Sequence, residues 1–249
     1  MKSILRYLGV KDIDLTEYGI EQYKTYCEPF SGSFNTGIKL AESNYTGKII
    51  YNDLDIEVYN FWESLVENPD RVYNNYVELN REVLNVIDNI QAEEIIKKHA
   101  KSKDKFERAS AEYIYRMCLT MKGLKVNNRL TEKTELIDMY LTAELFKQQK
   151  IEINNLDYRD IIEQINKPDT FLLVDPPYIN CKSAKNYRCD SLNFNHIELF
   201  KILNNFKGAW LLTYNNDPII KDLYREYNIK EVKRNLFGRD YIELYITNK

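Results

Sequence analysis

The most constraining feature of the sequence is the stretch TFLLVDPPYIN at 170–180. Its four consecutive apolar residues predict a strand that is buried on both faces. This strand runs directly into Asp175, Pro176, Pro177 and Tyr178. The two prolines keep the chain extended and remove two N–H donors, so the loop offers a carboxylate, carbonyl oxygens and a flat ring. These groups are complementary to an exocyclic amino group on a flat ring. The alternative is that the loop only caps a core strand.

Other segments show the same alternation of strands and helices. Strands are predicted over 25–30, 48–53, 151–157, 170–176 and 209–216, and a hairpin of two more strands around 237–240. Helices are predicted between them, over 35–43, 159–166, 195–206 and 217–227. Such units pack as a parallel sheet with right-handed crossovers. We therefore expect an α/β fold with a mixed, mostly parallel seven-stranded sheet and a C-terminal antiparallel hairpin.

The middle of the chain is predicted to be helical. From residue 56 to about residue 150, strand signals nearly vanish and apolar residues recur at helical spacing. The first of these helices is expected to stop at Pro69. Further helices are predicted over 70–88, 91–100, 104–121 and 134–149, with a turn-rich stretch at 121–133. We expect a helical insertion, 56–150, within a domain formed by 1–55 and 151–249.

Three predicted strands end on acids, Glu28, Asp53 and Asp175. In an open parallel sheet, ligands bind beyond the carboxyl ends of the strands. In EPFSGS (28–33), a sharp turn at Gly32 exposes backbone N–H groups and lets a ligand approach closely. Asp53 follows about 20 residues later, where an acid can hold ribose hydroxyls. Capping of the next helix is the alternative role for Asp53.

Composition restricts the class of protein. The chain has 249 residues, of which 44% are hydrophobic, and we find neither a signal peptide nor an apolar run of the roughly 20 residues that span a membrane. Its four cysteines include no CxxC pair and there are only two histidines, so we expect no metal site and no disulfide framework. The expectation is a soluble cytoplasmic protein with reduced thiols.

Charge is unevenly distributed along the chain. The net charge is −3, yet residues 97–150 contain 13 Lys/Arg and 7 Asp/Glu, a local net charge of +6 that leaves −9 for the remainder. Such an asymmetry indicates a basic face suited to phosphates. The alternative is an ordinary solvated helix surface.

The motifs, taken in order, resemble a known family. They are EPFSGS, YNDLD, DPPY and LTYNN, with RYLGVK near the start and RDYIELYITN at the end. In this order they look like the Dam-like (D12 class) DNA adenine-N6 methyltransferases, which take the methyl group from S-adenosylmethionine. The resemblance covers most of the chain and places the central helical stretch where the family has its target-recognition region. It implies a Rossmann-like class I methyltransferase fold and chemistry without a metal.

The resemblance also implies roles for particular residues. Tyr7 and Lys11 would lie near the methionine end of the cofactor, and Asp53 would hold its ribose. The residues implied to bind the cofactor are Tyr7, Lys11, Glu28, Pro29, Phe30, Ser31, Gly32, Asp53, Asp157 and Tyr158, the last two at its adenine. Those implied to receive the target base are Asp175, Pro176, Pro177 and Tyr178. DNA phosphate contacts are expected from Arg116, Lys122, Lys125 and Arg129.

The implied reaction is methyl transfer to N6 of an adenine that the enzyme flips out of double-stranded DNA. We expect a monomer, with a restriction endonuclease as a candidate partner. Two positions depart from the family pattern: Phe34 stands where a second glycine is usual, and Val10 interrupts the usual Gly-Gly-Lys. These departures keep open a non-catalytic DNA-binding protein on a methyltransferase scaffold. DPPY also occurs in N4-cytosine methyltransferases, the nearest alternative enzyme.

Neutralising Lys122, Lys125 and Arg129 together tests the basic face. We expect weaker DNA binding and a flatter dependence of log K on log salt, because each lost phosphate contact lowers the slope by about 0.9 and three lower it by about 2.7. S-adenosylmethionine affinity should not change. Salt titrations with a labelled duplex measure the slope. An unaltered slope and affinity would leave a solvated helix surface, with DNA entering over the basic loop 182–188.

Overall fold

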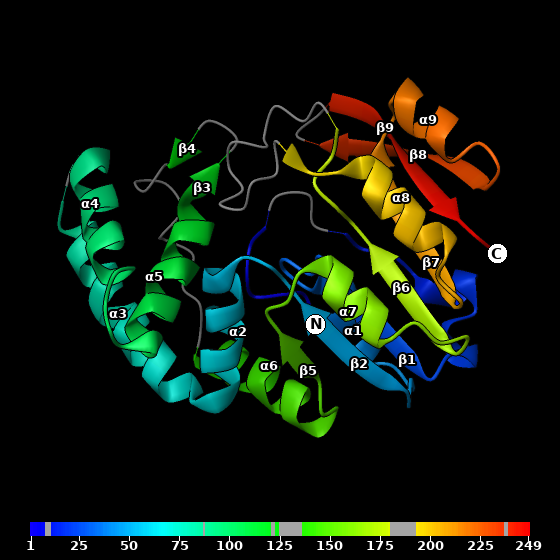
Figure 1. Ribbon diagram of the computed structural model, residues 1–249. Coiled ribbons are helices and arrows are strands. Elements are labelled where there is room, and N and C mark those ends of the chain that lie inside the picture. Colours follow the sequence, from blue (N-terminus) through cyan, green and yellow to red (C-terminus); the bar gives the residue numbers. More distant parts are fainter. Residues whose placement is uncertain (8–10, 87, 121–122, 125–135, 180–192, 237–238) are drawn as a thin grey trace. The chain divides into compact units, whose positions relative to one another are not determined.

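The computed structural model describes residues 1–7, 11–86, 88–120, 123–124, 136–179, 193–236 and 239–249. The chain forms two compact units. The first comprises Met1–Asp14, Gly32–Tyr45 and Asp55–Asn155, and the second comprises Leu15–Ser31, Thr46–Leu54 and Leu156–Lys249. Helices dominate the first unit and strands the second (Figure 1). The functional division expected from the sequence, 1–55 with 151–249 against 56–150, stays a prediction.

The strands form a seven-stranded sheet in the order β5-β2-β1-β6-β7-β9-β8. Their bounds are β1 Thr25–Glu28, β2 Lys48–Asn52, β5 Glu152–Asn154, β6 Thr170–Val174, β7 Ala209–Asn215, β8 Asn228–Leu236 and β9 Arg239–Thr247. β1 pairs in parallel with β2 and β6, and β6 pairs in parallel with β7. β9 runs antiparallel to both β7 and β8. The sheet is mixed, as predicted, and β1, β2, β6 and β7 bring their carboxyl ends to one edge.

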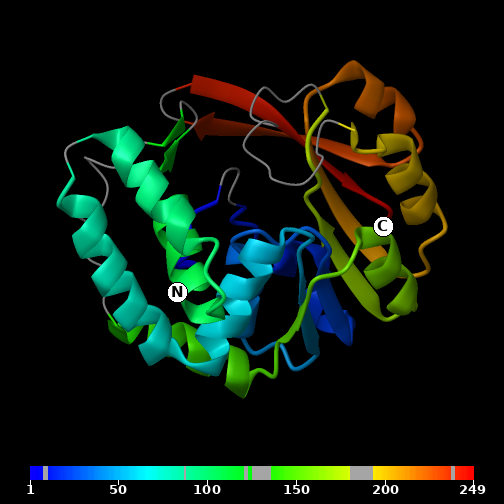
Figure 2. The ribbon, with the colours of Figure 1, turned by 60° about the vertical axis from the view of Figure 1, so that its left-hand side comes forward.

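Strand β6 is buried on both faces, as its apolar run predicts. On one face, Leu172 and Val174 join a core that includes residues of helices α7 Tyr158–Gln164, α8 His196–Asn204 and α9 Pro218–Leu223. Figures 1 and 2 show these three helices on the same side of the sheet. On the other face, the ring of Phe171 lies 5.4 Å from that of Tyr23 and 6.4 Å from that of Tyr26, between centroids.

The helices of the first unit follow the predicted order. They are α1 Asn35–Ala41, α2 Ile56–Glu67, α3 Pro69–Leu84, α4 Asn89–His99, α5 Lys105–Cys118 and α6 Leu136–Gln148. α2 ends at Glu67, just before Pro69, as predicted, and Pro69 also begins α3. Asn68 caps α3 by accepting from the backbone N of Arg71 at 3.0 Å. Proline is favoured at a first helical position, where its missing N–H has no partner to lose.

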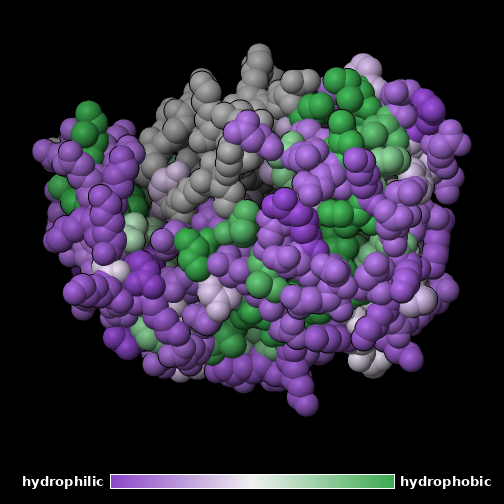
Figure 3. Space-filling view, in the orientation of Figure 1, coloured by the Kyte–Doolittle hydropathy of each residue, from purple (hydrophilic) through white to green (hydrophobic). Residues whose placement is uncertain are grey.

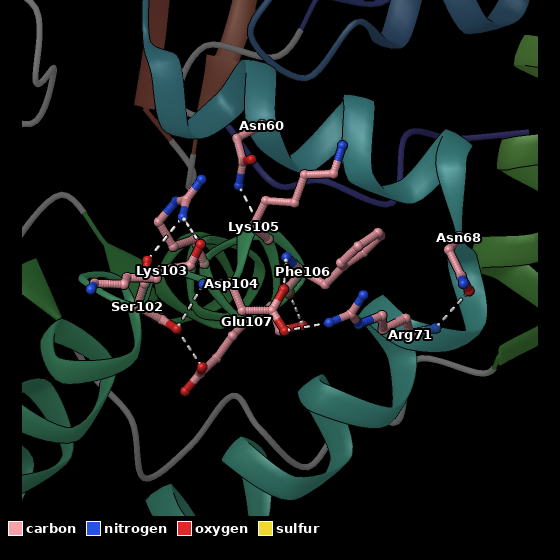
Figure 4. A network of polar contacts seen from close by, with 11 residues as sticks. Asn60, Asn68, Arg71, Ser102, Lys103, Asp104, Lys105, Phe106 and Glu107 are labelled. Carbon is pink, nitrogen blue, oxygen red and sulfur yellow. Dashed lines mark hydrogen bonds and ion pairs between the residues drawn. The ribbon is translucent and has the colours of Figure 1, made fainter.

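Polar contacts join α2 and α3 to the start of α5 (Figure 4). Asn60 donates its side-chain amide to the backbone oxygen of Lys105 at 3.0 Å, and Arg71 pairs with Asp104 at 2.7 Å. The ammonium group of Lys105 also pairs with Glu67. Lys105, one of the cations of the segment 97–150, is therefore paired within this unit.

The remaining described elements are short. They are the 3-10 helices Leu15–Tyr18 and Ile20–Gln22 and the antiparallel strands β3 Leu119–Thr120 and β4 Gly123–Leu124. The predicted turn-rich stretch 121–133 lies largely outside the described residues. Among the helices described, none has the length and apolar character needed to cross a membrane. In the view of Figure 3, hydrophilic side chains surround separate apolar areas of the surface.

Candidate active site

Asn52, at the end of β2, joins three segments of the second unit. Its side-chain amide donates to the backbone oxygens of Pro29 and Leu156, both at 3.0 Å, and its Oδ1 accepts from the backbone N of Leu156 at 3.0 Å. The side chain is fully buried. It thereby fixes the loop after β1, the end of β2 and the segment before α7 against one another. These segments contain most of the residues expected at the cofactor.

Ser31, in the loop after β1, makes further hydrogen bonds that stabilise this loop. Ser31 donates its backbone N–H to the oxygen of Asn52 at 2.9 Å, while its Oγ donates to the oxygen of Glu28 at 2.7 Å and accepts from the N–H of Asn52 at 3.0 Å. The Glu28 carboxylate is buried, and the Tyr26 hydroxyl donates to its Oε1 at 2.6 Å. Residues 26 and 28 share a face of the strand, so β1 itself orients this acid.

Phe30 and Tyr158, both expected at the cofactor, lie in contact. Their ring centroids are 5.3 Å apart, and Phe194 lies 5.7 Å from Phe30 and 5.4 Å from Tyr158. The neighbouring Asp157 caps α7 and pairs with the Arg159 guanidinium at 2.7 Å. This hydrogen bond lowers the pKa of Asp157, whereas burial raises the pKa of Tyr158 to about 12. Near neutral pH, Asp157 is therefore charged and Tyr158 neutral.

Strand β7 holds the DPPY loop. The Thr213 hydroxyl donates to Asp175 Oδ1 at 2.5 Å, and the Asn215 amide donates to the backbone oxygen of Ile179 at 3.1 Å. Asp175 is partly exposed, whereas Pro176 is buried. Because β6 and β7 are parallel neighbours, the polar end of one strand lies beside the loop that leaves the other. The LTYNN motif therefore orients both the carboxylate and the backbone of this loop.

Tyr178 contacts a buried acid of the C-terminal hairpin. Its hydroxyl donates to Glu243 Oε1 at 2.7 Å, and Glu243 Oε2 accepts from Arg234 Nε at 3.3 Å. The Tyr178 ring lies 5.6 Å from the Tyr214 ring, between centroids. Burial raises the pKa of Tyr178 well above its usual value, and the negative charges of Asp175 and Glu243 add to the effect. Tyr178 is therefore a neutral hydrogen-bond donor at any physiological pH.

In the first unit, Gly32 and Tyr7 are in close contact. Gly32 has a φ of +50°, and a Cβ at this position would lie 2.9 Å from Cδ1 of Tyr7. The Trp62 indole donates to the backbone oxygen of Gly32 at 3.2 Å. Only glycine combines this backbone conformation with this close approach. Lys11, another expected cofactor residue, accepts a hydrogen bond from the Asn35 amide at its backbone oxygen, at 2.8 Å.

Phe34, which stands where the family pattern usually has a glycine, has a left-handed backbone conformation that favours glycine. Its φ is +55°, and its side chain is fully buried. Its ring lies 5.9 Å from the Phe146 ring, and it packs so closely on Gly37 that a Cβ there would lie 2.3 Å from Cε2 of Phe34. The left-handed conformation costs a non-glycine residue about 1–2 kcal/mol. Burial of the aromatic ring in the helical core offsets that cost.

Arg116 does not contact DNA phosphate from this position, which corrects the expectation. Its side chain is 2% exposed, and its guanidinium bonds to Glu112 at 2.5 Å and to Asp55 at 2.8 Å. It also lies 4.5 Å from the centre of the Tyr7 ring. Desolvation opposes its charge, but Glu112, Tyr7 and Asp55 outweigh this and raise the pKa of Arg116. Arg116 is thus an interior cation of the first unit.

The other expected residues have mixed outcomes. Lys122, Lys125 and Arg129, and also Val10, lie outside the described residues. Asp53 is buried at the end of β2. It does not cap the next helix, because Asp55 does so by accepting from the backbone N of Glu57 at 3.1 Å. In the part of the chain that the structure describes, no group of three or more His, Cys, Asp and Glu residues could hold a metal ion.

Sequence reasoning missed the residues that hold these loops, namely Asn52, Thr213, Asn215 and Glu243. A signal was present for each of them. Asn52, Thr213 and Asn215 are polar residues at the ends of apolar strands, and Glu243 is an acid within an alternating one. The signal shows that such a residue is unusual, but it does not show which loop the residue contacts.

A comparison with family models bears directly on these residues. The model of the D12 class N6 adenine-specific DNA methyltransferase matches residues 13–236. The chain belongs to this family. It is therefore an adenine-specific DNA methyltransferase that acts on DNA, and the family implies S-adenosylmethionine as its methyl donor. The resemblance drawn from the motifs is confirmed, and nothing in the match supports the N4-cytosine or non-catalytic alternatives. A search of the curated proteins finds no match to this chain.

Replacing Phe34 tests its backbone conformation. Phe34→Ala should lower the free energy of unfolding by about 3–5 kcal/mol through the lost ring. Phe34→Gly should lose about 1 kcal/mol less, because glycine adopts a positive φ without strain. Urea unfolding measures both. At Phe146, a buried position inside α6, the order should reverse, with the glycine variant less stable than the alanine variant. An alanine variant at position 34 as stable as the glycine variant would contradict the positive φ.

Removing the Arg116 cation tests its interior role. Arg116→Met should lower the free energy of unfolding by about 3–5 kcal/mol, because Asp55 and Glu112 would stay buried without their partner. The control is Arg225→Met, which removes an exposed guanidinium paired with Asp222 and should leave the urea midpoint unchanged. Folded Arg116→Met should keep the wild-type salt slope of DNA binding. A reduced salt slope with an unchanged free energy of unfolding would show that Arg116 does contact DNA phosphate.

Proposed function

We propose that the chain transfers a methyl group to N6 of an adenine that is flipped out of double-stranded DNA, on a Rossmann-like class I methyltransferase fold. The observation that best supports this is the anchored DPPY loop, in which Thr213 donates a hydrogen bond to Asp175 and Tyr178 donates one to Glu243. Hydrogen-bond acceptors and an aromatic ring are thereby held at the carboxyl edge of parallel strands, where open α/β sheets bind their ligands.

Asp175 and the backbone oxygen of Pro176 are proposed to accept the two N–H groups of the target amine. N6 is a poor nucleophile because its lone pair is delocalised into the ring. Hydrogen bonds to a carboxylate are of the stronger, charge-assisted kind, and they localise the lone pair and direct it. The bond that Thr213 donates uses one of several acceptor positions on the Asp175 carboxylate.

The methyl transfer then needs no base stronger than a carboxylate. When bound, S-adenosylmethionine supplies a methyl group on a positively charged sulfur. The bond from N6 to the methyl carbon forms as the bond from sulfur breaks, and the electron pair of that bond stays on sulfur. N6 becomes acidic as it gains the methyl group, so Asp175 takes or relays its proton. Most of the rate is proposed to come from positioning.

The residues at the strand ends of the second unit fit this cofactor by their chemistry. Glu28 and Asp53 are carboxylates, suited to an ammonium group and to ribose hydroxyls, and Phe30 offers a ring face. Asn52 joins the segments that carry these residues through hydrogen bonds from its side-chain amide. In this unit we propose cofactor contacts from Glu28, Pro29, Phe30, Ser31, Asp53, Asp157 and Tyr158. Tyr7, Lys11 and Gly32 keep their expected roles as proposals.

Tyr178 is proposed to stack on the extruded base. Flipping costs a few kcal/mol of unstacking and unpairing, and a base–aromatic stack returns about 1–3 kcal/mol. Pro177 limits the conformations of the loop, so little entropy is lost when the base binds. Lys122, Lys125 and Arg129 remain the proposed phosphate contacts. A monomeric, cytoplasmic enzyme with a restriction endonuclease partner also remains a proposal.

Asp175→Ala tests the assigned mechanism. Turnover should fall by about 10²–10³, the usual effect of losing one key electrostatic group, while S-adenosylmethionine affinity stays within twofold. The assay measures labelled methyl transfer to unmethylated DNA, with chromatographic separation of the nucleosides. Asp222→Ala, which removes an exposed acid of α9, is the control and should keep the wild-type rate. Turnover above about a tenth of wild type would refute the role of Asp175, and N4-methylcytosine as product would refute the target base.

A further inference from the structure

We propose that Glu243 is a positioning residue for the target base, which sets the orientation of the Tyr178 ring by accepting the hydrogen bond of its hydroxyl. Arg234, from the neighbouring strand, balances the charge of this carboxylate. The proposal rests on the proposed role of Tyr178 as the stacking partner of the flipped adenine. The motif resemblance assigns no role to either Glu243 or Arg234.

Glu243 lies where a carboxylate is costly. Strand β9 runs between β7 and β8, and Glu243 is paired with Asn215 of β7 and is only 1% exposed. Its neighbours Leu244 and Ile246 belong to the core that α7, α8 and α9 cover. The side chain of Glu243 points to the opposite face, because successive residues alternate along a strand. An acid buried in this way is unfavourable unless it is paired and hydrogen-bonded.

The partners of Glu243 point to a role beyond stability. One oxygen accepts from the Tyr178 hydroxyl at 2.7 Å and the other from Arg234 Nε at 3.3 Å. Arg234 also donates to the Tyr245 hydroxyl. An apolar residue of similar volume often stabilises a buried site as well as an ion pair does. A carboxylate at this position differs from such a residue in offering Tyr178 a strong, fixed acceptor.

The Tyr178 hydroxyl has a single proton, and Tyr178 uses it in the hydrogen bond to Glu243. Asp175 is close enough for its charge to raise the pKa of Tyr178. A tyrosine that donated to Asp175 would occupy an acceptor position that the adenine amine needs. Tyr178 instead donates its hydroxyl to Glu243, and Asp175 accepts a hydrogen bond from Thr213. The hydrogen bond to Glu243 therefore orients the Tyr178 ring for stacking, and the one from Thr213 orients Asp175 to accept the amine.

A double-mutant cycle on the full-length protein tests the proposal. Glu243→Gln keeps the shape of the side chain but removes its charge, and Tyr178→Phe keeps the ring but removes the hydroxyl. Each should lower kcat about 10-fold or more, the scale of one hydrogen bond to a charged group. The double variant should be no worse than the more affected single variant, because both changes remove the same bond. S-adenosylmethionine affinity, measured by calorimetry, should stay within twofold in all three.

The control is Glu231→Gln, which alters an exposed acid of β8 that pairs with Lys221 and should keep wild-type kcat. The positioning role is overturned if Glu243→Gln keeps kcat within twofold, or if the two single effects multiply in the double variant. It is also overturned if kcat falls only together with cofactor affinity and the urea midpoint. A wild-type protein that methylates no adenine would instead refute the proposed function itself, and the inference with it.

Discussion

The proposed cofactor segments of the second unit depend on one buried amide. Asn52 ends β2 and satisfies the backbone oxygens of Pro29 and Leu156 and the N–H of Leu156. An asparagine can do this because its side chain presents two donors and an acceptor in one plane. An apolar residue would leave these buried backbone groups without their partner, at about 1–3 kcal/mol each. The arrangement of the segments around Glu28, Asp53 and Asp157 is therefore a property of the folded sheet.

The loop that receives the base is ordered in a related way, by side chains that lie outside it. Its prolines supply no N–H donors, and Asp175 accepts a hydrogen bond from Thr213 on β7. Tyr178 donates its hydroxyl to Glu243 on β9. Strand β9 reaches this place because it pairs antiparallel with β7. The C-terminal hairpin thus completes the sheet and also supports the candidate site.

Local patterns predicted the elements well but failed where a distant partner decided. The run 171–174 became a strand buried on both faces, and helices formed at every predicted place among the described residues. Pro69 follows the end of α2, as predicted, and it also begins α3 behind the cap at Asn68. Arg116 was wrongly expected to contact DNA. Its pair with Glu112 is local in the sequence, but its bond to Asp55 spans 61 residues and no local pattern predicts it. Nothing local showed that its helix face is buried.

The sequence by itself determined the family, the mixed α/β class and the chemistry of the DPPY loop, because these follow from the identity and order of residues along the chain. Only the tertiary structure decided which groups orient that chemistry. The partner of Asp175 lies 38 residues away and the partner of Tyr178 lies 65 residues away. These contacts exist because β6, β7 and β9 are adjacent in the sheet. Strand order is set by how the whole chain buries its apolar faces, which no local propensity specifies.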